Sequence, residues 1–365
     1  MFSSEIEAGA GRGIASGFLS DDISRREKTG MKREQGFGLV EMMISAAIFL
    51  IVLAGTLSSL NDALGINEKA ALMADLEQNL RAGMNFVVQD FMQAGWGIPT
   101  GGLPIPTGAG MTAVNRPGPP GTSYTFSPSL TIAAVNPGAS LGPAGNGRAT
   151  DIVNILYADD LLLLNSRTLD AIAANGTNMT VNAATPISGV INAITAGDLI
   201  AFSNALGSTV QYVTRVAGQV VYFEAGDPMN LNQATAPQGA ILQLQSGGVF
   251  PPTTATRVSL VTYYLDTTTD PETPRLIRRI NNRAGQVVAL ILEDLQLTYD
   301  LVDGVTNPAN QATPIAPNSP NQIRKANAFL SGRSSSRIRN TGDFLRRSLT
   351  TQVGLRCLTF VDRYR

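Results

Sequence analysis

Histidine is absent from this 365-residue chain, and cysteine and tryptophan occur once each, as Cys357 and Trp96. Without histidine the chain cannot build a Ser-His-Asp or Cys-His catalytic centre, and most zinc sites are excluded. A single cysteine excludes an intramolecular disulfide. Charged residues make up only 15% of the chain and the net charge is −1, so no strong field favours nucleic acid. The sequence gives no positive case for an enzyme, and we expect neither a cofactor nor a metal.

Residues 37–60 form a long apolar run that contains one ionisable residue, Glu41. A helix rises about 1.5 Å per residue and about 20 residues cross the hydrocarbon core of a bilayer, so the run is long enough to span. Apolar side chains surround it on all sides, unlike those of a soluble amphipathic helix. A carboxylate here costs on the order of 3 kcal/mol in a bilayer, which makes Glu41 a functional candidate.

Cations precede the apolar run and are scarce after it. Those before it are Arg25, Arg26, Lys28, Lys32 and Arg33. Between Asn61 and Leu80 the only cation is Lys69. This asymmetry predicts a single-pass membrane protein with a cytoplasmic N-terminus and an exported C-terminal head.

Gly36, Phe37 and Glu41, spaced as they are between a basic leader and an apolar helix, resemble the prepilin signal of type IV pilins and type II secretion pseudopilins. The resemblance implies that a prepilin peptidase cuts after Gly36 and that Phe37, the new N-terminus, is N-methylated. It also implies that Glu41 pairs with the free amine of Phe37 on a neighbouring subunit, which would set axial register and offset the burial cost of both charges. The plain alternative is a single-span anchor with a chance glutamate.

The leader would occupy residues 1–36, and Met31 offers a second translation start. A start at Met31 would give a leader of a length typical of this family. Residues 1–30 are rich in glycine, serine and charge and have no apolar periodicity. They are either a disordered extension or an over-called start, and the second interpretation is favoured.

Beyond the apolar run, apolar residues recur at intervals of three and four and predict an amphipathic continuation of the helix over residues 61–97. The stripe comprises Met73, Leu76, Leu80, Met84, Val87 and Phe91, and the polar faces carry Asp62, Glu68, Asp75, Glu77, Arg81 and Asp90. Two interpretations stay open. One helix runs from Phe37 to about Gly95, with Gly55 and Gly65 as points for a bend, or a membrane helix precedes a separate soluble helix.

Arg81, Asp90 and the pair Ala94-Gly95 resemble the larger minor pilins of the PilW group. The resemblance implies an α+β, pilin-like fold, in which a long N-terminal helix with a membrane-spanning first half packs on a C-terminal antiparallel β-sheet. Residues 98–150 are rich in glycine and proline, and they form either a long surface loop with one strand or a low-complexity linker. Residues 151–365 are expected to form the β-rich head.

Within the head, alternating and β-branched runs predict strands, with a hairpin of residues 258–265 and 275–280 in the main sheet. Residues 187–224 resemble a small β insertion. Residues 323–331 predict a strand and residues 331–340 a mobile segment. The alternation from Leu349 to Cys357 predicts a last, half-buried strand with Cys357 as a buried structural cysteine.

Three further groups of residues are candidate binding sites, and each has a structural interpretation. The carboxylates of Asp266, Asp270 and Glu272 match no calcium loop and indicate a solvated turn. Trp96, Tyr263 and Tyr264 are expected to pack the helix–sheet core. Two arginine clusters favour a solvated face or an inter-subunit salt-bridge surface over DNA, because aromatics are not interleaved with them. The clusters are Arg275, Arg278, Arg279 and Arg283, and Arg333, Arg337, Arg339, Arg346 and Arg347.

These features predict a minor type IV pilin or pilin-like protein that primes, caps or modifies a filament. Its partners would be the prepilin peptidase, the inner membrane and other pilins, which it would meet through its N-terminal helix. The bulk of the head favours a low-copy role. A minor type II secretion pseudopilin of the J type is the first alternative, and a single-span membrane-anchored binding protein or enzyme is the second.

Overall fold

The computed structural model describes residues 38–339 and 341–359, and its first element is one long helix, α1 (Leu39–Gln93). The helix is unbroken at Gly55 and Gly65, so the interpretation as one helix is confirmed. It ends where the sequence predicts, because Gly95 adopts a left-handed φ of +79° and donates its N–H to the Leu156 carbonyl oxygen. A Cβ at Gly95 would lie 2.7 Å from Leu358 Cδ2, so only glycine fits this turn.

The chain divides after Leu60 into two compact units, and the second contains all the described strands. The largest sheet is antiparallel with seven strands, in the order β10-β9-β13-β14-β15, while β6 pairs with β13 and β3 pairs with β6. Its strands are β3 (Val135–Gly138), β6 (Ile152–Ala158), β9 (Leu199–Asn204), β10 (Gly207–Tyr212), β13 (Thr254–Asp266), β14 (Arg275–Ile280) and β15 (Gln286–Leu290). Because β13 pairs with β6, β9 and β14, it is the central strand of the head.

Smaller antiparallel sheets complete the described part of the second unit. The three-stranded sheet has the order β16-β17-β18 and the four-stranded sheet the order β11-β12-β8-β7. Their strands are β16 (Leu292–Leu301), β17 (Ile323–Arg337), β18 (Phe344–Gly354), β7 (Ala171–Ile172), β8 (Asn178–Thr180), β11 (Arg215–Ala217) and β12 (Val220–Tyr222). Two short pairs remain, β1 (Leu103–Pro104) with β2 (Thr131–Ile132), and β4 (Ala144–Gly145) with β5 (Arg148–Ala149). The short helices are η1 (Leu164–Ser166), η2 (Ile241–Leu244), η3 (Pro320–Gln322) and α2 (Arg356–Thr359).

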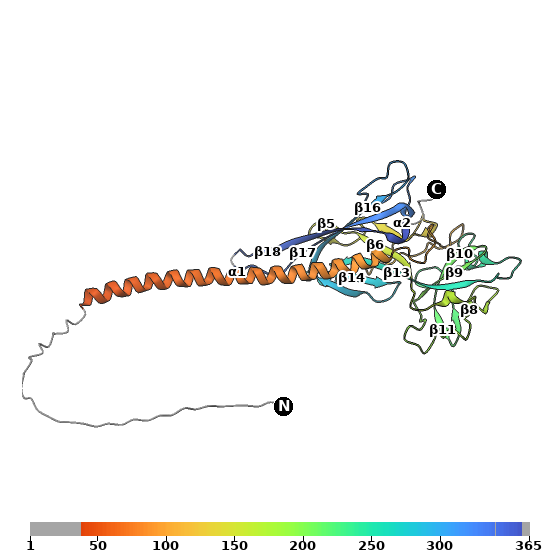
Figure 1. Ribbon diagram of the computed structural model, residues 1–365, viewed down its shortest axis with the longest axis horizontal. Helices are drawn as coiled ribbons and strands as arrows, with labels where there is room; N and C mark the ends of the chain where they lie inside the picture. The colour runs from red at the N-terminus through yellow and green to blue at the C-terminus, as the bar shows by residue number, and fades with distance from the viewer. Residues whose placement is uncertain (1–37, 340, 360–365) are drawn as a thin grey trace, which may run out of the picture. The chain divides into compact units, whose positions relative to one another are not determined.

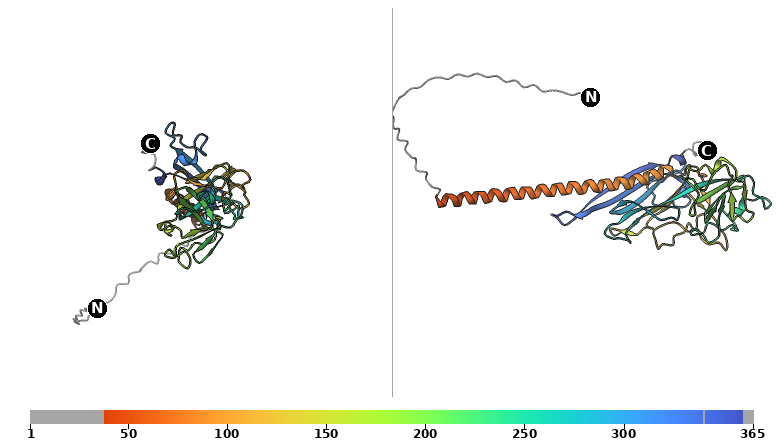
Figure 2. Two further views of the ribbon diagram at one scale, coloured as in Figure 1. Left: turned by 90° about the vertical axis from the view of Figure 1, so that its right-hand side faces the viewer. Right: turned by 90° about the horizontal axis from the view of Figure 1, so that it is seen from below.

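The largest core lies where the second half of α1 meets two sheets. Leu76, Leu80, Met84, Val87 and Phe91 are buried together with residues of β6, β13, β16 and β17. Figures 1 and 2 show the β17–β18 hairpin beside this half of α1, and Gly332 of β17 lies close to Leu76. Figure 1 shows β8 and β11 of the four-stranded sheet near β9, at the opposite end of the head from β18. The α+β, pilin-like arrangement of a long helix packed on antiparallel sheets is therefore confirmed.

Several local predictions need correction. The predicted β insertion at residues 187–224 is divided between two sheets, because β9 and β10 join the main sheet through β13 whereas β11 and β12 lie in the separate four-stranded sheet. β17 continues to Arg337 because its partner β18 runs alongside, although serine and arginine had suggested a mobile segment. Residues 98–150 contain five short strands where the sequence suggested one. β18 ends at Gly354, and Cys357 lies in α2, where it is only partly buried.

Candidate functional site

The first half of α1 is a helical surface without any partner in the described chain. Every residue from Leu39 to Leu64 is exposed, including Phe49, Leu50 and Ile51 at 64%, 61% and 72%. The helix is long and apolar enough to cross a membrane, with a mean hydropathy of 2.2 in its most apolar window. A soluble protein would bury such an apolar helix surface within its own fold. We therefore expect lipid or other helices to cover this segment.

Glu41 lies in the first turn of α1 and is the acidic residue of that turn. A carboxylate near a helix N-terminus is favoured by the unpaired N–H groups and the helix dipole. No hydrogen bond or ion pair to another described residue engages its side chain, so it is free to meet a group from outside the chain. Gly36 and Phe37, the predicted processing residues, lie outside the described residues, as does the leader.

Asp90 was expected on a polar face of the helix, but it lies on the buried face. It is 3% exposed, and Arg278 of β14 donates to it from Nε at 2.7 Å and Nη2 at 2.9 Å. The hydroxyls of Tyr157 and Tyr263 donate to the same carboxylate. Burial, and then the charge of Asp90, raise the pKa of both tyrosines well above the ordinary value of 10. The carboxylate therefore ties α1 to β6, β13 and β14.

The spacing of the apolar stripe contained the signal for Asp90. Buried positions recur at Leu76, Leu80, Gly83 and Val87, and the next steps of three and four reach Asp90 and Ala94. An acidic residue on a buried stripe needs a cation opposite it. The sequence offers many arginines and does not say which one lies there.

The arginines of the first cluster bind within the head rather than forming a solvated or inter-subunit face. Arg275 pairs with Asp266 at 3.0 Å, Arg278 with Asp90 at 2.7 Å and Arg283 with Asp198 at 2.8 Å. In the second cluster, Arg333 and Arg346 pair with the buried Glu293, and Arg333 and Arg337 lie over the ring of Phe344. Most of these cations are therefore neutralised or stacked inside one subunit.

The aromatic residues separate into core and surface. Tyr263 is fully buried in the helix–sheet core, as predicted. Tyr264 is also buried, but in a separate cluster with Ile152 and Ile277 that includes no residue of α1, so its predicted place in the helix–sheet core is wrong. Trp96 contradicts the prediction, because it is 52% exposed and its indole donates to the carboxylate of Asp160 at 2.5 Å. The turn at Gly95 directs the chain away from the core before Trp96 can enter it.

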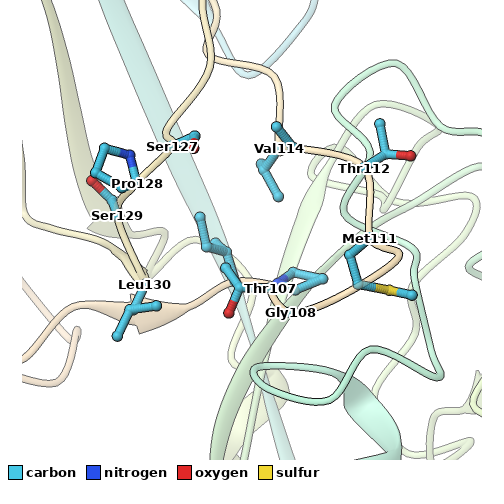
Figure 3. Close-up of a pocket in the computed structure, with 12 residues that line it drawn as sticks. Thr107, Gly108, Met111, Thr112, Val114, Ser127, Pro128, Ser129 and Leu130 are labelled. Carbon is cyan, nitrogen blue, oxygen red and sulfur yellow. The ribbon is translucent and has the colours of Figure 1, made fainter.

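Within the described residues, no group of three or more Cys, Asp or Glu side chains is placed to hold a metal ion. Asp266 and Asp270 instead accept hydrogen bonds from threonines of their own turn, Thr268 and Thr273. A pocket of about 210 Å³ lies between residues within 105–114 and 127–130, whose side chains line it (Figure 3). Its described lining includes no charged side chain, so it offers no group for acid–base chemistry.

Comparison with known proteins adds one finding. Residues 31–57 match the family model described as the prokaryotic N-terminal methylation motif. Neither the curated proteins nor the solved structures contain a significant match to this chain. The motif implies processing by a prepilin peptidase, and with the apolar helix it indicates membrane anchoring followed by pilus assembly. Proteins with this segment are typically structural rather than enzymatic. The chain is therefore pilin-like, with the N-terminal methylation motif of the type IV pilin and pseudopilin superfamily.

Proposed function

We propose that the protein is a minor pilin, a structural subunit that primes, caps or modifies a type IV pilus. One observation carries the proposal: the methylation motif at residues 31–57 overlaps a helix that is exposed on every side from Leu39 to Leu64. A bare apolar helix directly after a processing signal is suited first to a bilayer and then to the core of a helical filament.

In this proposal the peptidase cuts after Gly36 and Phe37 becomes the methylated N-terminus. Removal of the basic leader frees the helix from the cytoplasmic side of the inner membrane, with the head on the exported side. Glu41 remains as the one charge within the apolar run, and a neighbour's Phe37 amine neutralises it. A misaligned helix would leave the carboxylate buried and unpaired, at a cost of several kcal/mol, so the pair selects a single register.

The head supports a minor rather than a major role. The second unit extends from Asn61 to Arg365 and carries sheets beyond the two that pack against α1. A major subunit is repeated along the whole filament and must pack closely against its copies, whereas a low-copy subunit is free to carry a bulky head. The PilW-like pattern of Arg81, Asp90 and Ala94-Gly95 agrees with this role.

N-terminal sequencing tests the processing step. The full chain is expressed in a bacterium that assembles type IV pili, and the protein is recovered from membrane and sheared-filament fractions. We expect a mature chain that starts at N-methylated Phe37. Gly36→Val should block the cut because a bulky side chain fills the peptidase site, whereas Gly38→Ala is the matched control. A mature chain that keeps residues upstream of Phe37 would overturn the proposal.

Glu41→Gln tests the assembly step separately from processing. We expect normal cleavage and membrane insertion, with incorporation into filaments reduced by about tenfold or more, since the charge pair is lost. Glu77→Gln, on an exposed face of the same helix, is the matched control and should incorporate normally. Normal incorporation of Glu41→Gln would remove the register role. Recovery of the chain with a type II secretion apparatus instead of pili would favour the J-type alternative.

A further inference from the structure

A polar pocket of about 300 Å³ lies in the head where the loop between β1 and β2 meets the turn after β14. Arg116 lines it from the loop and Arg279 from the end of β14. Three prolines, Pro117, Pro119 and Pro120, form part of the wall. Because proline has no N–H, these three residues contribute no backbone donor, and the two guanidinium groups are the charged donors of the described lining.

Arg116 is held by neutral acceptors alone. It donates to Asn154 Oδ1 at 2.5 Å and to the carbonyl oxygens of Pro137 and Asn136 at 2.7 Å each. No carboxylate of the described chain lies within ion-pair distance. Burial lowers the pKa of Arg116 to about 10, and nearby tyrosines offset this only in part. The fold therefore keeps a largely buried cation without a counter-charge, which is costly unless an anion joins it.

Arg279 shows the same pattern, and its neighbours show that the pattern is unusual. It donates to the carbonyl oxygens of Arg283 at 2.7 Å, Gly118 at 3.2 Å and Asn282 at 3.2 Å, and to Asn282 Oδ1 at 2.5 Å. Arg275, Arg278 and Arg283 each have an aspartate partner. Of the four arginines in this part of the chain, Arg279 alone has only neutral partners in the described structure, and it is the one that lines the pocket with Arg116.

We propose that this pocket binds an oxyanion group, such as a phosphate, sulfate or carboxylate carried by a larger ligand, between Arg116 and Arg279. A guanidinium has five N–H donors in a planar fork, and the hydrogen bonds described above leave donors on both arginines. Charge-assisted bonds to an oxyanion are roughly twice as strong as neutral ones. A volume near 300 Å³ accepts one such group with part of its carrier. The head would thereby recognise an anionic molecule outside the membrane, whether or not the chain joins a filament.

Titration of the purified full chain in detergent tests the site. Inorganic phosphate, inorganic sulfate and acetate are added in separate calorimetric titrations at constant ionic strength set with sodium chloride, and the three arms show which oxyanion the pocket prefers. We expect saturable binding of at least one anion and a matching rise in melting temperature. Absence of saturable binding for all three anions would overturn the proposal, and this measurement needs no variant to fold.

Variants assign the binding to this pocket. Arg279→Gln should weaken binding of the preferred anion by about tenfold or more, since it removes the charge and the charge-assisted hydrogen bonds of the guanidinium. The affinity of Arg279→Lys for the anion should lie between those of the unmodified chain and Arg279→Gln, because lysine keeps the positive charge but lacks the planar set of guanidinium donors. Arg215→Gln is the matched control, because Arg215 is exposed and pairs with Glu224 away from the pocket. Binding that is unchanged in Arg279→Gln, or weakened equally in Arg215→Gln, would show an adventitious ion only.

Discussion

At the scale of single residues, Asp90 joins helix α1 to three strands of the main sheet. Its carboxylate accepts hydrogen bonds from Arg278 and from two tyrosine hydroxyls, and it is almost fully buried. The pair Asp90–Arg278 is favourable only while both members are present, because either charge left alone in the core is uncompensated. The attachment of the helix to the sheet therefore depends on one charge at this position as well as on apolar packing.

Asp90→Asn should lower the free energy of unfolding by about 3–5 kcal/mol, because Arg278 then stays buried without a counter-charge. Denaturant unfolding of the full chain, followed by the fluorescence of the single Trp96, measures the change. Glu77→Gln is the control on the same helix, where an exposed pair with Arg81 contributes about 0.5 kcal/mol or less. A loss below about 1 kcal/mol for Asp90→Asn would contradict this view of the pair.

At the scale of elements, a charge pair closes the β13–β14 hairpin at its loop end. Asp266 and Arg275 are cross-strand partners, and the Arg275 guanidinium donates to Asp266 at 3.0 Å. Burial alone would raise the pKa of Asp266, but hydrogen bonds from Thr269 and Thr268 outweigh it and lower the pKa to about 2. The folded chain therefore holds this carboxylate ionised more strongly than the unfolded chain does.

The depressed pKa predicts how stability depends on pH. The contribution of Asp266 is fully present above its unfolded pKa of 3.8 and is lost as pH falls through about 2. Asp266→Asn should therefore lower the free energy of unfolding most at pH values above about 5, and by progressively less as the pH falls toward 2. Denaturant unfolding across this range measures the difference, and Asp75→Asn on the exposed face of α1 controls for the loss of one charge. An equal cost at every pH would contradict the prediction.

At Gly83, α1 approaches the main sheet closely. A Cβ added there would lie 3.0 Å from Ala289 Cβ and 3.2 Å from Leu276 Cδ2. Gly83→Ala should therefore lower the free energy of unfolding by about 1 kcal/mol or more, although alanine favours a helix by about 1 kcal/mol. Gly55→Ala, with no atom within 4 Å of the added Cβ, should leave head stability unchanged. Stabilisation by Gly83→Ala would show that the contact is loose.

The elements differ in how far the sequence predicts them. The helix and the β13–β14 hairpin depend on local periodicity and were predicted closely. The extent of β17 and the membership of β9 in the main sheet depend on partners far away in the sequence, β18 and β13, which no local pattern specifies. Two-residue strands such as β4 and β5 carry too few residues for any periodicity. Tertiary pairing, rather than propensity, decides these segments.

At the scale of the whole molecule, the chain combines an N-terminal segment that needs an outside partner with a head that is complete in itself. The described cores all lie in the second unit, from Asn61 onwards. The methylation motif was readable from sequence because its residues are neighbours in the chain. The oxyanion pocket was not readable, since Arg116 and Arg279 are distant in sequence and only the fold brings them to one cavity.

A chain that starts at Asn61 should fold without detergent and unfold cooperatively. Its melting temperature should lie within about 4 °C of that of the full chain, which corresponds to a change of roughly 1 kcal/mol at this size. Circular dichroism measures the melting temperatures of both chains. Asp90→Asn, introduced into each, should lower both melting temperatures equally. A molten, non-cooperative fragment would show that the first unit takes part in folding the head.

The central place of β13 has a consequence for the order of events during synthesis and export. β6 and β9 leave the ribosome well before β13. One edge of each pairs with an early strand, β3 or β10, but the partner of the other edge begins only at Thr254. Until β13 has been synthesised, each of these two apolar strands has an unpaired edge, which favours aggregation. Any nascent or truncated chain that stops before Thr254 should depend on a holding chaperone or be degraded.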